Sequence, residues 1–209
     1  MVAAYAGARS AIWFQTQRDI EAERQSEAGQ VNVVILHLIA RLQWIEGLRS
    51  DAIEPQRHRS LRHFELLPIL TKLPAPIPDL VVLRAVLRSG NEGASLVLEL
   101  VSQEQQYDQL LSLIAKRNTV HLRVQEALGA ANVPNGAMIG QEDMRRIIGA
   151  VLEKNLVDLT DSVIEGVDSC ALSSRVLIEK LTAFSRAHFR DIGILELKKP
   201  VSPANQAKV

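Results

Sequence analysis

The densest group of chemically active side chains in this sequence is the basic stretch RHRSLRH at residues 57–63. If the stretch is helical, Arg59, Arg62 and His63 share one face, because they are separated by three and four positions. Such a group could bind a phosphate group, a lipid headgroup or an acidic partner. The more common outcome for a short basic run is a solvated face that pairs with nearby acidic residues. Arg59, Arg62 and His63 are therefore a candidate anion-binding patch.

Four carboxylates recur at helical spacing in the C-terminal third of the chain. They are Asp158, Asp161, Glu165 and Asp168. Mg²⁺ and Ca²⁺ prefer oxygen ligands, but those ligands must converge on the ion. A stripe of this length extends over about 15 Å along one helix, which is too far for a single ion. We expect an acidic edge that faces solvent or a partner, and we predict no metal site.

Polar residues interrupt the apolar face that is expected for residues 94–131. Tyr107, Asn118 and His121 fall on this face, where a small ligand could bind between helices. The favoured alternative is a satisfied polar layer that fixes the register of the helices, because the segment offers His121 no charged partner. Glu104 lies on the same face, and we expect it where this face meets water or a basic neighbour.

The sequence contains no motif of a known catalytic class. G-x-S-x-G, S-x-x-K, a glycine-rich phosphate loop and H-E-x-x-H do not occur, nor does the paired E-x-x-H of diiron bundles. The single cysteine, Cys170, excludes an intrachain disulfide and any site built on paired cysteines. No base can be assigned to activate its thiol. We therefore predict a protein that is not an enzyme and needs no cofactor.

The composition is typical of a helical protein. Apolar residues make up 47% of the 209 positions, while aromatic residues make up only 4%. The chain carries 24 Lys and Arg against 24 Asp and Glu. This balance disfavours nucleic-acid binding, which needs an excess of positive charge. A net charge of zero mildly favours self-association.

The positions of apolar residues and prolines predict the elements that carry these groups. Residues 4–54 contain no proline and carry a core stripe at alternating spacings of four and three, at Val31, Ile35, Leu38, Leu42, Ile45 and Leu48. Further long helices are expected over about 94–131 and 141–190, with a bend or break at Gly166, and short helices over about 57–68 and 80–89. The predicted fold is all-α: an antiparallel bundle of three long and one or two short helices. Residues 31–194 would form this bundle, and residues 195–209 a mobile tail.

Residues 1–30 do not fit this bundle, because they have helical length without a core stripe. Ile12, Trp13 and Phe14 stand together, and Ile20 is the only large apolar residue in the sixteen positions that follow. We expect a projecting helix that contacts either a second copy of the chain or a membrane interface, where Trp is enriched. In the second case VAAYAGARSAIWF would be the lower edge of an anchor that continues upstream of Met1. No run of 18 apolar residues forms a complete membrane span.

These patterns favour a non-enzymatic interaction or scaffold protein over a catalyst. The expected partner is another protein or a second copy, with membrane association through an upstream segment as a further expectation. The alternative function is a ligand-sensing bundle whose small-molecule pocket lies near Asn118 and His121.

Overall fold

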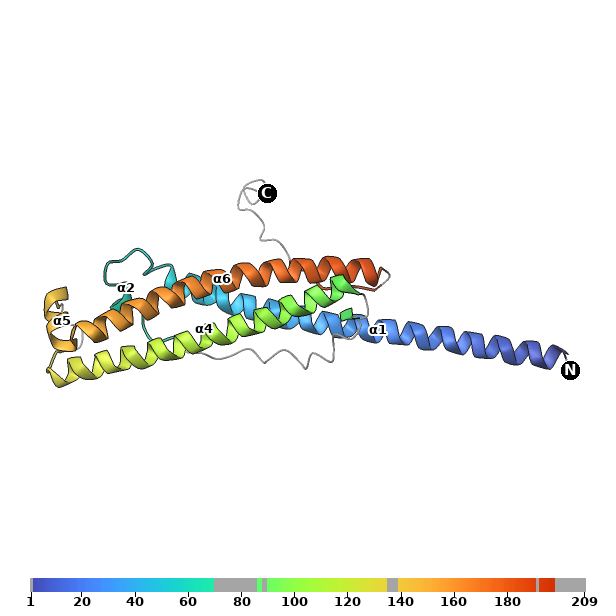
Figure 1. The fold of residues 1–209 in the computed structure, drawn as a ribbon, viewed down its shortest axis with the longest axis horizontal. Coiled ribbons are helices and arrows are strands. Elements are labelled where there is room, and N and C mark those ends of the chain that lie inside the picture. The colour runs from blue at the N-terminus through green and yellow to red at the C-terminus, as the bar shows by residue number, and fades with distance from the viewer. Residues whose placement is uncertain (1, 70–85, 88–89, 135–138, 191, 198–209) are drawn as a thin grey trace, which may run out of the picture. The chain divides into compact units, whose positions relative to one another are not determined.

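The computed structural model describes residues 2–69, 86–87, 90–134, 139–190 and 192–197, with side chains described from residue 12 onward. Within these ranges the regular secondary structure is entirely helical, which confirms the predicted all-α fold. The elements are α1 (Val2–Leu48), the π-helical turn η1 (Arg49–Ile53), α2 (Arg62–Glu65), α4 (Asn91–Ala130), α5 (Gln141–Ile148) and α6 (Ala150–His188), as labelled in Figure 1. The predicted short helix at 80–89 falls largely outside the described residues.

The core stripe of α1 is buried as predicted, except at its last position, Leu48, which is only partly buried. Side chains spaced by four and three residues lose nearly all of their solvent exposure, namely Val31, Ile35, Leu38, Leu42 and Ile45. The helix passes into the π-helical turn η1 just before Pro55, whose ring prevents further helical hydrogen bonding. The stripe therefore determines which face of α1 packs, and the proline limits its length.

The chain divides into two compact units, to which α1, α4 and α6 each contribute segments. Unit 1 consists of Met1–Ile39, Ala75–Leu98 and Val176–Val209. Unit 2 consists of Ala40–Pro74 and Glu99–Arg175. Each unit is described separately below.

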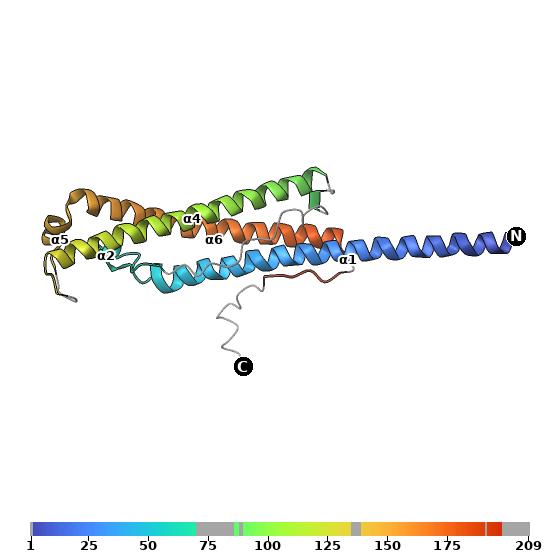
Figure 2. The ribbon, with the colours of Figure 1, turned by 90° about the horizontal axis from the view of Figure 1, so that it is seen from below.

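In unit 2, α6 runs antiparallel to both α1 and α4, while α1 and α4 run in the same direction (Figures 1 and 2). The antiparallel pair is joined by hydrogen bonds from Gln103 to Ser174 and from Arg117 to Thr160. The ion pair between Arg41 and Glu104 joins the parallel pair. Residues 49–90 separate α1 from α4, so these two helices are not constrained by a short turn to run in opposite directions.

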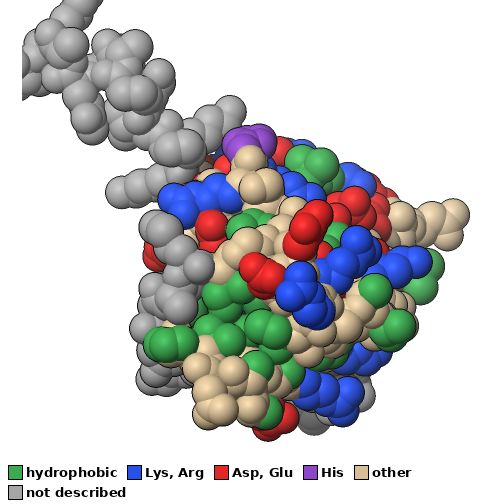
Figure 3. All heavy atoms as spheres, turned by 90° about the vertical axis from the view of Figure 1, so that its left-hand side faces the viewer, with side chains coloured by type: hydrophobic (Ala, Val, Ile, Leu, Met, Phe, Trp, Pro, Cys, Tyr) green, Lys and Arg blue, Asp and Glu red, His purple; other side chains and the backbone are tan. Residues whose placement is uncertain are grey.

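The short helix α5 caps one end of unit 2. Its Ile148 packs in a cluster with Val124 of α4 and Leu156 of α6. Viewed toward the side of the molecule where α5 lies, acidic and basic side chains are interspersed on the surface around apolar ones (Figure 3). This face therefore presents no large area of a single charge.

The break between α5 and α6 lies at Gly149, so the prediction of one helix from 141 to 190 with a bend at Gly166 was wrong. Gly149 has a φ of +81°, which favours glycine because it lacks a Cβ. Gly166 is helical, and a Cβ there would lie 3.2 Å from Cδ1 of Leu110. Its role is to allow α4 and α6 to approach closely.

In unit 1, the segment after α6 is held against α1. The Asn32 side chain donates to the carbonyl oxygen of Gly193 (2.8 Å) and accepts from the backbone N–H of Leu195 (2.9 Å). Glu196 forms an ion pair with Arg186. Leu195 and Glu196 are thus tied to helices at the start of the predicted tail, and residues 198–209 lie outside the described residues.

Candidate functional site

The N-terminal part of α1 exposes its large apolar side chains, and it extends beyond the end of α6 within unit 1 (Figure 1). Ile12, Trp13 and Phe14 retain 67%, 58% and 63% of their accessible surface, and Ile20 retains 47%. The rings of Trp13 and Phe14 contact each other edge to face, with centroids 5.1 Å apart. The structure thus brings together the predicted interaction residues at 12–14.

The three apolar side chains point in different directions around the helix. Successive helical residues are rotated by about 100°, so Ile12, Trp13 and Phe14 cover more than half of the circumference at one level. Beyond them, residues 15–26 are polar except for Ile20 and Ala22. The apolar surface is therefore a band around the helix and does not continue as a stripe along it.

By length and composition, one helical stretch of the described chain could cross a membrane, within Ile12–Ile53. The apolar window in this range is 44% buried by the rest of the protein. A helix from a protein core meets the same criteria, and Val31, Ile35 and Leu38 in this range are such core residues. This property is therefore weak support for a membrane span.

The basic cluster at 57–63 is engaged within unit 2. Arg57 donates to both carboxylate oxygens of Asp168, at 2.9 and 3.0 Å, and this bond raises the pKa of the guanidinium. Arg62 donates to Asp161 at 2.9 Å. Two carboxylates of the predicted acidic edge therefore bind arginines of the same chain.

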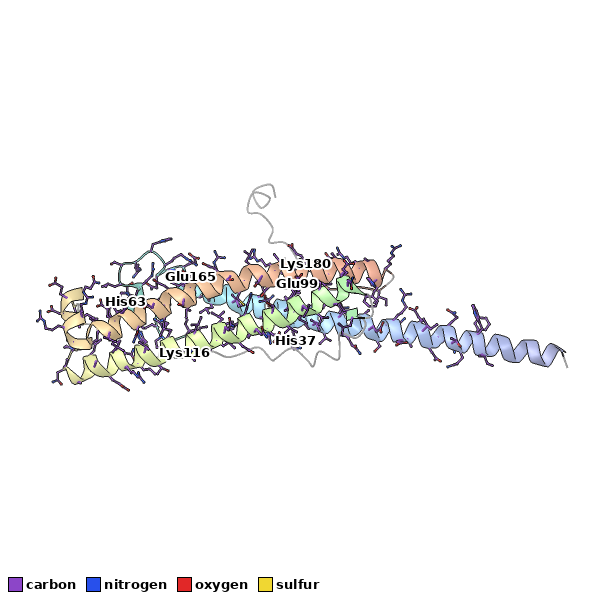
Figure 4. The ribbon with its side chains drawn as sticks, in the orientation of Figure 1. His37, His63, Glu99, Lys116, Glu165 and Lys180 are labelled. Carbon is purple, nitrogen blue, oxygen red and sulfur yellow. The ribbon has the colours of Figure 1, made fainter. Side chains whose placement is uncertain are left out.

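The three members of the candidate anion-binding patch do not share an open surface. Arg59 pairs with Glu65 at 3.0 Å and Arg62 with Asp161, whereas the side chain of His63 is buried. His63 belongs to α2 and lies toward the α5 end of unit 2 (Figure 4). Burial lowers the pKa of its imidazole, and Nε2 has no hydrogen-bond partner among the described residues. The described residues contain no group of three or more His, Cys, Asp or Glu side chains that could hold a metal ion.

A fully buried arginine at the centre of unit 2 was missed by the sequence analysis. The guanidinium of Arg117 donates to the carbonyl oxygens of His63, Leu66 and Leu67, and to the hydroxyl of Thr160. Burial lowers its pKa to about 10. These carbonyls belong to the end of α2, where a helix leaves acceptors unsatisfied. The one available signal was the position of Arg117 midway between Ile114 and His121 on the core face of α4.

Tyr107, Asn118 and His121 have three different surroundings. The Asn118 amide is hydrogen-bonded to the backbone of Ile69, and the ring of Tyr107 is buried, with no partner for its hydroxyl among the described residues. His121 is also buried, and Nε2 of its imidazole lies 3.2 Å from the Gln125 amide, while Nδ1 has no hydrogen-bond partner in the described part of the chain. Burial and the nearby Arg117 lower the pKa of His121 to about 4.

Arg41 is the basic neighbour that the sequence analysis expected for Glu104. The two side chains form an ion pair, and the guanidinium carbon of Arg41 lies 4.5 Å from the centroid of the Tyr107 ring. The Tyr107 ring in turn meets Trp44 edge to face, at 5.9 Å. Burial raises the pKa of the Tyr107 phenol to about 12. Tyr107 thus supports Trp44 from the inside of unit 2.

An open groove of about 580 Å³ lies beside Trp44. It is lined by Trp44, Gly47, Leu48, Asp51, Ala52, Gln56, Glu65, Leu66, Leu67, Pro68 and Ile69. A second groove, of about 480 Å³, lies at the start of α6 around Glu153 and Lys154. Neither groove is lined by Tyr107, Asn118 or His121. The groove beside Trp44 is thus built from residues that the sequence analysis did not single out.

Comparison with protein-family models, curated proteins and solved structures found no match to this chain.

Proposed function

We propose that this protein is a non-enzymatic helical-bundle protein that is held at a lipid bilayer surface by the N-terminal part of α1, and that the bundle acts through protein contacts. The observation that carries the proposal is the exposed apolar band at Ile12, Trp13 and Phe14. Trp, like Tyr, is enriched at the boundary between lipid and water, and the apolar side chains of Ile12 and Phe14 would be buried beside it.

The shape of the band favours lipid over a second helix. A partner helix covers a stripe of residues spaced by three and four positions. From Ile12, such a stripe passes through Thr16, Asp19 and Glu23, so it offers little apolar contact. A partner on any one side would also leave Trp13 or Phe14 in water. A helix that enters a bilayer is surrounded by the interface at one level, so the interface would cover all three side chains.

The distribution of charge along α1 agrees with a helix whose first residues meet the lipid and whose following residues stand in water. Arg9 is the only charged residue among positions 2–14, whereas residues 15–27 include Arg18, Asp19 and Glu21. The apolar band therefore lies where α1 changes from weakly polar to strongly polar sequence. Residues 15–27 would stand in water and separate the bundle from the lipid.

The full chain should sediment with phosphatidylcholine vesicles that contain about one-quarter phosphatidylglycerol. The double variant Trp13→Gln with Phe14→Gln should bind at least about tenfold more weakly, because burial of each ring contributes roughly 2 kcal/mol. The matched control is Val33→Gln with Leu36→Gln, which removes exposed apolar side chains elsewhere on α1 and should leave binding unchanged.

Two results would contradict the lipid proposal. One is sedimentation of the wild-type chain that vesicles do not change. The other is a stable dimer in solution that the Trp13 and Phe14 substitutions dissociate, which would assign the band to a second copy. The ligand-sensing alternative at Asn118 and His121 receives no support from a described groove, and we do not propose it.

A further inference from the structure

We propose that the groove beside Trp44 binds a small organic cation, namely an ammonium, amidinium or guanidinium group carried on an apolar body. This inference concerns unit 2 alone and does not depend on the lipid proposal. A volume of about 580 Å³ lies within the range of small-molecule sites, which is about 300–1,000 Å³.

The charge of the groove selects for a cation. The described residues of its lining include the carboxylates of Asp51 and Glu65 and no Lys, Arg or His. Asp51 accepts a hydrogen bond from the Ser50 hydroxyl at 2.6 Å, and no basic side chain of the described residues pairs with it. Glu65 is bound by Arg59 through Oε2. The carboxylate of Asp51 thus remains available to a positively charged ligand.

The groove also presents an unsatisfied acceptor and an aromatic ring. The side-chain oxygen of Gln56 is buried and receives no hydrogen bond from the described residues. A buried acceptor without a donor is costly, so the Gln56 amide would gain by turning toward an N–H group of a ligand in the groove. The indole of Trp44 adds an electron-rich face of the kind that attracts organic cations. All three features favour a ligand that donates hydrogen bonds and carries positive charge.

The walls of the groove are fixed by residues behind them. The extended segment Leu66–Ile69 is held by Arg117, through the carbonyls of Leu66 and Leu67, and by Asn118, through Ile69. Trp44 is supported by Tyr107. The apolar side chains of this segment would contact the body of the ligand. A preformed site binds with a smaller entropic cost than one that must become ordered.

The test uses three probes of one shape and different charge: benzamidine, benzamide and benzoate. Each is titrated into the isotope-labelled full chain while backbone amide resonances are recorded. Benzamidine should give saturable shifts at Gly47, Asp51 and Leu67, with a dissociation constant of about 0.1–1 mM, as expected for a ligand of this size. Benzamide and benzoate should bind at least about tenfold more weakly.

Asp51→Asn should weaken benzamidine binding by about fivefold or more, since it removes the charge and keeps the shape. The matched control is Asp108→Asn, an exposed carboxylate of unit 2 that does not line the groove, and it should leave binding unchanged. Circular dichroism of each variant confirms the fold. Equal affinity for the three probes, shifts at residues outside the groove, or no saturable shift up to about 10 mM would each overturn the proposal.

Discussion

The side chain of Asn118 forms two hydrogen bonds with the backbone of Ile69, accepting from its N–H at 3.0 Å and donating to its carbonyl oxygen at 2.8 Å. A carboxamide satisfies both backbone groups of one residue in this geometry, as a neighbouring strand would. Residues 66–69 lack regular secondary structure, so these bonds and those of Arg117 replace the missing backbone partners.

Asn118→Asp should therefore release Ile69 from α4, because a carboxylate cannot donate to the Ile69 carbonyl. Amide hydrogen exchange at Ile69 should accelerate by about tenfold or more, and the free energy of unfolding should fall by about 1–3 kcal/mol. Thr119→Asp, at an exposed neighbouring position on α4, is the control and should leave exchange at Ile69 unchanged. Unaltered exchange in Asn118→Asp would show that other contacts hold the segment.

Arg117→Met should be among the most destabilising single substitutions in unit 2. It removes the donors for three carbonyls and for Thr160, which surround a side chain with 0% exposure. We expect a loss of about 3–5 kcal/mol in the free energy of unfolding by urea. Arg123→Met, at an exposed position of the same helix, should change it by less than about 0.5 kcal/mol. Similar values for the two variants would contradict this role of Arg117.

Acid should destabilise the protein through its buried histidines. The folded pKa of His121 is about 4, below the ordinary value of 6.5, so the unfolded chain takes up the proton first. The contribution of His121 to stability is complete above about pH 6.5 and is lost as the pH falls through about 4; in total it is on the order of 3 kcal/mol. Burial shifts the pKa of His63 in the same direction.

The unfolding free energy of wild type, measured by urea titration from pH 7.5 to pH 4, should therefore decline more steeply than that of His121→Gln. The control is His58→Gln, which changes an exposed imidazole in the same unit and should follow the wild-type curve. Parallel curves for wild type and His121→Gln would show that His121 does not contribute to acid sensitivity.

The substitutions Gly149→Ala and Gly129→Ala should change the free energy of unfolding in opposite directions. Gly149→Ala should destabilise by about 1–3 kcal/mol, because φ of +81° with ψ of 148° is strained for any residue with a Cβ. Gly129→Ala should stabilise by about 0.5–1 kcal/mol, because Gly129 is helical and a Cβ there meets nothing within 4 Å. Thermal unfolding of the two variants distinguishes these signs, and a stabilising Gly149→Ala would contradict the assigned break.

The sequence was sufficient to predict the all-α fold, because the stripe on α1 repeats over several turns and prolines and glycines limit the elements. It was not sufficient to identify which glycine breaks the last helix. Gly149 and Gly166 are both preceded and followed by helix-forming residues. Gly149 takes a positive φ and ends α5, whereas Gly166 stays helical, with Leu110 of α4 packed against it. That contact is tertiary and leaves no local signal.

Of the two candidate sites, one could be predicted from the sequence and the other could not. The apolar residues at 12–14 were recognisable because they have no core stripe after them. The groove beside Trp44 was not recognisable, because it is lined by residues from the end of α1 and from 65–69. Its shape depends on hydrogen bonds from Arg117 and Asn118. Arginine on a core face has no clear sequence signal when its acceptors are backbone carbonyls.

The parallel direction of α1 and α4 in unit 2 also bears on the order of folding. Arg117 and Thr160 are 43 residues apart in the chain, whereas Glu46 and Arg175, which join α1 to α6, are 129 apart. Contacts between distant residues form more slowly, because a longer loop must close first. We expect α4 and α6 to pair early, and α1 to dock onto that pair in a later kinetic step. Pulsed hydrogen exchange during refolding should then protect the amides of α4 and α6 before those of residues 40–48.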